Sequence, residues 1–448
     1  MDIVRNVLAV ALLAVTSLGF CQECAHADSM AELSIECQIQ AGSFTGLDGI
    51  VDGIVIAHDG QNKNVYGFDS KTCENLWTVS VEDLTLSDAE VFGHTVIVVT
   101  LDPKAGHVNM SSMGPITLPG YVMGLDAMSG QELWRSAATT GYPDDITASS
   151  GVVLIDGEAH LEAFDLVSGN QLWQAGAANA PSLSSPLAVS GVYVRWEGIG
   201  DKDNESANVV ARRITDGQVI WSVGRLMGFS SELAASSGTS SIIVTSHIGE
   251  DEGDGTLIEA LNATGAVEWH HEVALATDPL VVDGTVYLSE YQNLSPDGNG
   301  ILVALSVENG DQLWSLTGQG LTRADAVYGS LLVAMDEQGL LAIDTGNGSV
   351  RWKFASAEDA GAFAASPIVV NDKIVIADGT LLSQLDLMTG RIQWQGELPS
   401  SNSPDGSPFG WCMSLLKVPM LYDGQNLIVT SCESYIVKLD LRFTGEAA

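Results

Sequence analysis

The sequence predicts an all-β protein that folds as a closed β-propeller of four-stranded antiparallel blades. Three observations predict it: a segment that recurs eight times and ends in tryptophan, a glycine turn at a fixed distance before that tryptophan, and short alternating apolar stretches between the copies. Eight of the ten tryptophans end a copy. They are Trp77, Trp134, Trp173, Trp221, Trp269, Trp314, Trp352 and Trp394.

Each copy has the composition of a tight hairpin. In seven copies glycine stands four residues before the tryptophan, where a tight turn needs a positive φ. In five copies aspartate stands eight residues before it, where a short carboxylate can accept hydrogen bonds from the amides of the turn. The copy that ends at Trp77 has Cys73 in the glycine position.

Two further short strands precede each hairpin, as at residues 279–282 and 285–289, so each unit is a sheet of four strands, A to D in chain order. Such a sheet cannot bury both of its faces alone. Neighbouring units must stack face to face, and a ring leaves no exposed end. The tryptophan near the start of strand D is expected to fill the space between adjacent blades, which is a structural role.

The last unit lacks its fourth strand. Residues 418–422, 427–431 and 435–441 supply three strands, and the chain ends at residue 448. The segment 31–40, ahead of the first full unit, has the length and alternation of the missing strand. We therefore expect an N-terminal strand to close the ring by pairing with the C-terminal unit.

The repeat pattern Ala-x-Asp-x-x-(Thr/Ser)-Gly-x-x-x-Trp, clearest at Ala163 to Trp173 and at Ala342 to Trp352, resembles the tryptophan-docking motif of the pyrroloquinoline-quinone-like (PQQ-like) propeller family. The resemblance covers nearly all of residues 28–448. It implies a propeller, commonly of eight blades, shared by quinoprotein dehydrogenases and by a non-enzymatic branch of BamB-like envelope proteins. A direct count of the repeat units gives nine: eight full units, and one unit to which both ends of the chain contribute strands. Both counts stay open, and the family favours eight.

The first 27 residues are typical of a cleavable signal peptide: Arg5, an apolar run over residues 7–20, and the small-residue triplet at 25–27. We expect residues 28–448 to form a single propeller domain that is secreted or extracytoplasmic, in the periplasm or at the cell surface. The apolar run is too short to span a bilayer. Cys21 follows a loose lipoprotein-like motif, but Phe20 stands where a small residue is needed, which disfavours a lipid anchor at Cys21.

Acidic side chains far outnumber basic ones, 57 against 18, for a formal net charge of −39. A strongly negative surface favours solubility and repels phosphate backbones and anionic lipids. We therefore expect no nucleic-acid partner.

Four cysteines follow the signal peptide: Cys37, Cys73, Cys412 and Cys432. Exported thiols are usually oxidised, so an even number predicts two disulfides, and three pairings are possible. Strand placement favours Cys37 with Cys73 and Cys412 with Cys432. Cys412 precedes strand A of the final unit and Cys432 ends its strand B, while the first pair would hold the ring closed.

Insertions recur in the B-to-C connections, at residues 102–120, 197–206, 249–256 and 292–300. In a propeller these connections emerge on the same face as the D-to-A connections, and elaborated loops on a rigid scaffold are where binding usually occurs. Three of these loops are acidic, and the D-to-A connection 398–413 adds a tryptophan. The predicted binding face consists of Asp201, Asp203, Glu205, Asp251, Glu252, Asp254, Asp297 and Trp411.

The acidic loops also suggest calcium, because dense carboxylate oxygens suit this ion, although none of the loops has the EF-hand spacing. The candidate ligands are Asp201, Asp203 and Glu205 in one loop, or Glu250, Asp251 and Asp254 in the next. The alternative is that these loops are simply solvated in an acidic protein. No other cofactor is expected.

The dehydrogenase branch of the resemblance implies adjacent cysteines beside a quinone, a calcium site and a longer chain. This sequence has no Cys-Cys pair and no Cys-x-x-Cys-His haem motif. We expect no catalytic residues, and a non-catalytic binding or scaffold propeller with a protein partner in the envelope or extracellular space. Two alternatives stay open: a PQQ- and calcium-dependent alcohol or sugar dehydrogenase, and a carbohydrate-binding module that uses Trp196 or Trp411 as a stacking platform.

Overall fold

Within each unit the strands form an antiparallel meander, and many of the connections are tight turns. At Asp283-Gly284, for example, both residues have positive φ, 48° and 77°, as a two-residue type I′ hairpin requires. The computed structural model describes residues 35–40, 45–59, 63–81, 85–102, 120–138, 143–157, 160–175, 186–198, 206–226, 231–235, 241–248, 255–276, 279–291, 300–317, 323–336, 338–355, 367–370, 372–378, 381–397, 420–422, 426–431 and 435–440.

The strands group into blades that we name by the tryptophan of strand D, and the blade that joins the N-terminal and C-terminal strands is the closing blade. The closing blade contains β1 (Ile35–Gln40), β35 (Met420–Tyr422), β36 (Asn426–Ser431) and β37 (Tyr435–Asp440). The Trp77 blade contains β2 (Thr45–Val51), β3 (Ile54–Asp59), β4 (Asn64–Asp69) and β5 (Asn75–Ser80). The Trp134 blade contains β6 (Thr85–Phe92), β7 (Thr95–Leu101), β8 (Gly120–Asp126) and β9 (Glu132–Ala138). The Trp173 blade contains β10 (Pro143–Ser149), β11 (Val152–Gly157), β12 (Leu161–Asp165) and β13 (Gln171–Ala175), and the Trp221 blade contains β14 (Leu187–Val189), β15 (Val192–Gly198), β16 (Ser206–Arg213) and β17 (Val219–Leu226).

Strand A is short in the Trp269 blade and is divided into two pieces in the Trp314 blade. It has regular length in the Trp352 blade and is short in the Trp394 blade. The Trp269 blade contains β18 (Leu233–Ala234), β19 (Ile242–His247), β20 (Thr256–Leu261) and β21 (Val267–Val273). The Trp314 blade contains β22 (Leu275–Ala276), β23 (Leu280–Val282), β24 (Thr285–Tyr291), β25 (Gly300–Ser306) and β26 (Gln312–Thr317). The Trp352 blade contains β27 (Arg323–Tyr328), β28 (Leu331–Asp336), β29 (Gly339–Asp344) and β30 (Val350–Ala355). The Trp394 blade contains β31 (Ile368–Val370), β32 (Lys373–Asp378), β33 (Leu381–Asp386) and β34 (Ile392–Glu397).

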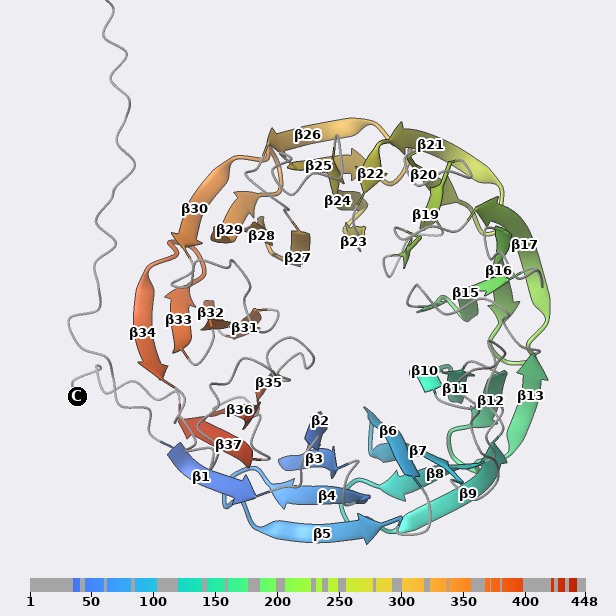
Figure 1. The fold of residues 1–448 in the computed structure, drawn as a ribbon, viewed down its shortest axis with the longest axis vertical. Helices are drawn as coiled ribbons and strands as arrows, with labels where there is room; N and C mark the ends of the chain where they lie inside the picture. The colour runs from blue at the N-terminus through green and yellow to red at the C-terminus, as the bar shows by residue number, and fades with distance from the viewer. Residues whose placement is uncertain are drawn as a thin grey trace, which may run out of the picture.

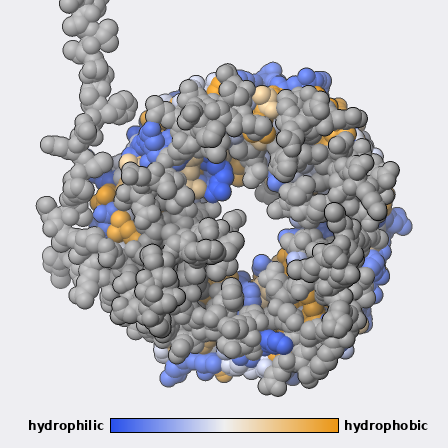
Figure 2. All heavy atoms as spheres, in the orientation of Figure 1, coloured by the Kyte–Doolittle hydropathy of each residue, from blue (hydrophilic) through white to orange (hydrophobic). Residues whose placement is uncertain are grey.

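The blades stand around a ring, with strand A innermost and strand D outermost, and a central opening passes through it (Figures 1 and 2). The closed all-β propeller predicted from the sequence is confirmed. The described strands form eight hydrogen-bonded sheets, the number that the family favoured. One of those sheets contains two four-stranded units, the Trp221 and Trp269 blades, joined by the single pair Leu226 and His247. Counted by four-stranded units, the ring therefore has nine blades, the direct count from the sequence.

The ring is closed by the N-terminal strand, as the sequence predicts. β1 pairs antiparallel with β37, and the closing blade has the order β1-β37-β36-β35. Its outermost strand therefore comes from the start of the chain and its other three strands from the end (Figure 1). Among the described residues the structure contains no helix that is long and apolar enough to span a membrane.

The position of a strand in its blade explains its composition. Strands B and C have a neighbouring blade on each face, so they are largely buried and mostly apolar, and all six residues of β11 are buried. Strand D lies at the rim and exposes most of its residues, with the tryptophan pointing inward: in β9, Leu133 is 50% exposed and Trp134 is 8% exposed. The hydrophobic core is thus divided into clusters, each between two adjacent blades.

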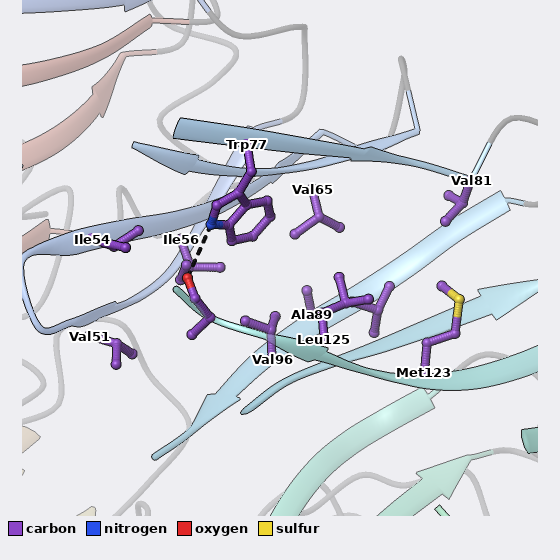
Figure 3. Close-up of a cluster of buried hydrophobic side chains, with 12 residues drawn as sticks. Val51, Ile54, Ile56, Val65, Trp77, Val81, Ala89, Val96, Met123 and Leu125 are labelled. Atoms are coloured by element: carbon purple, nitrogen blue, oxygen red, sulfur yellow. Dashed lines mark hydrogen bonds between the residues drawn. The ribbon is translucent and has the colours of Figure 1, made fainter. Parts of the chain in front are cut away.

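Trp77 illustrates one such cluster (Figure 3). Its indole lies between the Trp77 and Trp134 blades, among side chains from both, including Ile56 and Val65 on one side and Val96 and Leu125 on the other. Equivalent clusters contain Trp134, Trp173, Trp221, Trp269, Trp314 and Trp352.

Candidate functional site

The repeated tryptophans dock on the backbone of the next blade. Trp134 Nε1 donates a hydrogen bond to Leu166 O at 3.0 Å, and Trp269 Nε1 donates to Val307 O at 2.7 Å. In each case the acceptor stands three residues before the turn glycine of the following blade. The same bond is made by Trp77, Trp173, Trp314 and Trp352. The docking role predicted for the repeat tryptophans is therefore seen.

The turn glycines have a second role that the sequence interpretation missed. A Cβ added at Gly169 would lie 2.3 Å from the ring of Trp134, and one at Gly310 would lie 2.8 Å from the ring of Trp269. Glycine is needed here for its positive φ and also because the indole of the preceding blade occupies the place of a side chain. The fixed spacing of glycine and tryptophan in seven copies was the available signal.

A small residue under the ring is the third part of this contact. Gly67 pairs with Trp77 across β4 and β5, and a Cβ at Gly67 would lie 2.2 Å from the indole. Alanine takes this position in most of the other blades, as at Ala163 opposite Trp173. The alanine of the repeat pattern therefore makes room for the indole of its own blade. The glycine makes room for the indole of the preceding blade.

The repeat aspartates cap the turns as predicted. Asp165 Oδ1 accepts hydrogen bonds from the amide and the hydroxyl of Ser168, both at 2.7 Å, and Asp386 does the same with Thr389. These bonds lower the pKa of Asp165 below its ordinary value.

We expect the stability of the protein to depend on pH through Asp165. Because its pKa is lowered in the folded state, its contribution is present above the ordinary value of 3.8 and is lost as pH falls through the folded-state pKa. Asp165→Asn should therefore reduce the difference between the free energies of unfolding measured by urea titration at pH 6 and pH 3. Ser168→Ala removes the hydroxyl donor but keeps the amide donor, and should have a smaller effect in the same direction. An unchanged pH dependence in both variants would contradict the expectation.

The residues predicted to form the binding face lie outside the described residues. These are Asp201, Asp203, Glu205, Glu250, Asp251, Glu252, Asp254, Asp297 and Trp411, together with Cys412 and Cys432. The calcium site and the pairing of Cys412 with Cys432 therefore stay predictions. Among the described residues, no group of three or more His, Cys, Asp or Glu side chains could hold a metal ion.

The structure describes β15, the strand that precedes the loop 199–205, and the charged side chains around it. Arg195 of β15 contacts Asp156 of β11, across the boundary between two blades, and its Nε donates to Glu197 at 3.1 Å. Arg212 of β16 binds both carboxylate oxygens of Glu197, at 3.0 and 2.9 Å. Tyr193 donates to the second oxygen of Asp156 at 2.9 Å. Two arginines are thus matched by two carboxylates, and we call these five residues the Arg195 cluster.

Burial governs the electrostatics of the Arg195 cluster. Asp156 and Arg195 are 5% and 3% exposed, and desolvation raises the pKa of Asp156 although Arg195 opposes it. Desolvation, followed by the charge of Asp156, raises the pKa of Tyr193 well above its ordinary value. Burial acts to lower the pKa of Arg195, but the attraction of Asp156 and Glu197 outweighs it, and the pKa is raised. The five residues of the cluster pair two arginines with two carboxylates and join β11 to β15 and β16.

The next two loops on the same face also begin beside charged side chains. Arg225 of β17 binds Glu259 of β20 in the following blade, with Nη2 to Oε1 at 3.0 Å. Glu290, at the end of β24 before the loop 292–299, has its pKa raised by burial, and the charge of His271 opposes the shift. These groups join neighbouring blades.

Trp196 cannot serve as a stacking platform for sugars, and that part of the sequence interpretation is wrong. It is 5% exposed and packs in the cluster between the Trp221 and Trp269 blades, against residues such as Val194 and Leu233. Strand B is covered on both faces, so an aromatic residue at this position is used in the core.

Cys73 occupies the glycine position of its turn with a φ of 59°, and it is disulfide-bonded. Its amide donates to Asp69 O at 2.8 Å, as the amide of Gly130 does to Asp126 O in the next blade. The substitution of cysteine for glycine therefore leaves the hairpin unchanged. The pairing with Cys37 stays a prediction at this point.

The sequence matches the family described as outer membrane protein assembly factor BamB, over residues 61–228 and 205–446. A relative with that name from Moranella endobia (strain PCIT) is 26% identical over 340 residues, which are 69% of this chain and 78% of that protein. Another, from Alkalilimnicola ehrlichii, is 27% identical over 153 residues, 31% of this chain and 38% of that protein.

Solved propeller structures are similar at lower identity. BamB from Moraxella catarrhalis is 14% identical with a TM-score of 0.47, covering 93% of this chain and all of that one. Quinohemoprotein alcohol dehydrogenase from Comamonas testosteroni is 12% identical with a TM-score of 0.47, covering 83% and 78%. Neither likeness bears on function. Because the family match extends over most of the sequence, the chain belongs to the BamB family of PQQ-like β-propellers.

Proposed function

We propose that this protein is a non-catalytic propeller of the cell envelope that acts as a scaffold in the assembly of outer membrane proteins. The family match over residues 61–446 carries this proposal, together with relatives that bear the name of an assembly factor. In this proposal residues 1–27 direct export and are then removed, and the partners of the chain are proteins of the envelope.

The way the repeat residues are used supports a scaffold. The tryptophans, turn glycines and turn aspartates serve contacts within and between blades. The charged side chains under the acidic loops are paired with each other, as in the Arg195 cluster. A rigid ring with elaborated loops on one face can hold a partner without any chemical step.

The acidic loops are the proposed contact with that partner. Asp201, Asp203 and Glu205 follow directly on β15, in a protein with a net charge of −39. Since the Arg195 cluster below is neutral, the charge of the loop is expected to attract a basic protein surface, directly or through bound Ca²⁺.

The experiment compares two variants with equal changes in charge. Asp201→Asn/Asp203→Asn/Glu205→Gln should weaken in-cell cross-linking to envelope proteins and lower the levels of outer membrane proteins at least threefold. Glu74→Gln/Glu132→Gln/Glu308→Gln neutralises three exposed carboxylates at the C-to-D turns, on the opposite face, and should leave both unchanged. Addition of a calcium chelator tests whether the contact requires Ca²⁺.

Equal effects of the two variants would remove the acidic loops from the proposal. Normal outer membrane protein levels after deletion of the whole gene would overturn the assembly function itself. Reduction of a dye by the protein after addition of pyrroloquinoline quinone and Ca²⁺ would favour the dehydrogenase alternative instead.

A further inference from the structure

Among the described residues, the boundary between the closing blade and the Trp77 blade has no docked tryptophan. The core cluster between the closing blade and the Trp77 blade contains Leu47, Val55, Ala57, Phe68 and Ile428, with no tryptophan among its described members. We call this boundary the closing seam. The outermost strand of the closing blade, which would carry the tryptophan, is β1 (Figure 1).

The strand register identifies the residue that stands in the tryptophan position. In the Trp173 blade, Ala163 pairs with Trp173 and the next residue, Phe164, pairs with Gln171, so that one residue of strand D is bulged out. In the closing blade Lys438 pairs with Cys37, and Leu439 pairs with Ile35. The bulge has the same form, and Cys37 therefore occupies the position of the docking tryptophan.

The partner position at the closing seam is also a cysteine. At the seven other described boundaries the docking tryptophan meets the turn glycine of the next blade. At the closing seam that glycine is replaced by Cys73, whose φ of 59° is close to the values of 65° to 79° at the seven glycines. Cys73 is disulfide-bonded.

The distances in the regular contacts are those of a disulfide. The Cγ of the docking tryptophan lies 2.7 to 3.1 Å from the place where a Cβ on the turn glycine would stand. In a disulfide the Sγ of one cysteine lies roughly 3 Å from the Cβ of the other, because the S–S bond is about 2.04 Å long. A cysteine in each of the two positions would thus place sulfur within bonding geometry.

Lys438 replaces the remaining parts of the indole. It stands where seven of the blades have glycine or alanine under the ring and the Trp394 blade has Gln384, and it is a long side chain that is only 4% exposed. Its Nζ donates to Lys71 O at 3.2 Å, one residue from the carbonyl that would correspond to the acceptor of a docking tryptophan. The ammonium group of Lys438 therefore reaches the turn that receives the indole at the regular boundaries.

We propose that Cys37 and Cys73 form a disulfide that takes the place of the tryptophan–glycine contact at the closing seam, so that the attachment of the closing strand depends on redox state. On formation, the two thiols lose two protons and two electrons, and a disulfide of a protein or small-molecule oxidant is reduced to two thiols. A dithiol reductant reverses the reaction. The disulfide fixes β1 on the Trp77 blade, where β37 can pair with it. The proposal is independent of the assembly function.

Peptide mapping of the exported protein without reductant should identify a Cys37–Cys73 peptide. A different partner for Cys73 would overturn the proposal. Reduction should lower the melting temperature by about 5 °C, and hydrogen exchange should accelerate first in β1 and β37. Uniform acceleration over all blades would contradict a role confined to the closing seam.

Two designed variants test whether the two kinds of contact are equivalent. Cys37→Trp/Cys73→Gly/Lys438→Ala installs the regular contact and should make the melting temperature insensitive to reductant, while remaining above that of Cys37→Ser/Cys73→Ser. Conversely, Trp134→Cys/Gly169→Cys should form a disulfide detectable by peptide mapping. Failure of that bond to form would overturn the geometric equivalence, whichever way the first variant behaves.

Discussion

Trp134→Ala is expected to lower the free energy of unfolding by about 3 to 5 kcal/mol. The side chain is 8% exposed and belongs to the cluster between its own blade and the Trp173 blade. Its removal would leave the carbonyl of Leu166 without its donor. The residues that face the two sides of the ring are Gly124 and Gly169. Because glycine has no side chain, neither residue can fill the cavity that the substitution leaves.

Urea titration of the purified variant checks this prediction. Leu133→Ala is the matched control, because Leu133 is adjacent in the same strand but 50% exposed, and its loss should change the free energy of unfolding by less than about 0.5 kcal/mol. A loss below about 1 kcal/mol for Trp134→Ala would show that the docked indoles are not what holds the blades together.

Arg195→Met is expected to cost about 3 to 5 kcal/mol at neutral pH, because it leaves the buried carboxylate of Asp156 without its cation. Without Arg195, the pKa of Asp156 should rise further above that of the unfolded chain. The folded state then binds a proton that the unfolded state does not, so the loss should shrink as pH falls through the folded-state pKa of Asp156. Urea titrations at pH 7 and pH 5 measure this difference.

Two further variants separate the charge effect from a loss of packing. Arg195→Met/Asp156→Leu removes both charges and should recover most of the lost stability. Arg213→Met breaks an ion pair with Asp216 whose partners are 49% and 40% exposed, and should cost less than about 1 kcal/mol. A loss for Arg195→Met that does not vary with pH or with the second substitution would contradict the electrostatic explanation.

The propeller could be predicted from the sequence because its signals are local and periodic. Trp134 and Gly169 each belong to a copy of one pattern, and the closing strand is the only alternating segment ahead of the first full unit. From the sequence, the count of blades is open between eight and nine, with eight favoured. Family precedent suggested eight, and the physical count of four-stranded units is nine.

Contacts between blades could not be predicted in the same way. Asp156 and Arg195 are 39 residues apart and meet only because strand B of one blade faces strand B of the next. Trp196 shows the same difficulty: an aromatic residue near a loop suggests a binding platform until its strand is found buried on both sides. The acidic loops carry no such pairing pattern, and their assignment as a binding face stays a prediction.

The direction of docking has a consequence for how such rings change in evolution. Each indole reaches forward, and the glycine that receives it belongs to the blade that follows. A duplicated unit therefore brings its own indole and its own glycine, and can be inserted between two old units without a compensating substitution in either. We therefore expect a whole blade to be inserted with least compensation at the tryptophan–glycine boundaries, and with most beside β1, where Cys37 and Cys73 stand in place of the indole and the glycine.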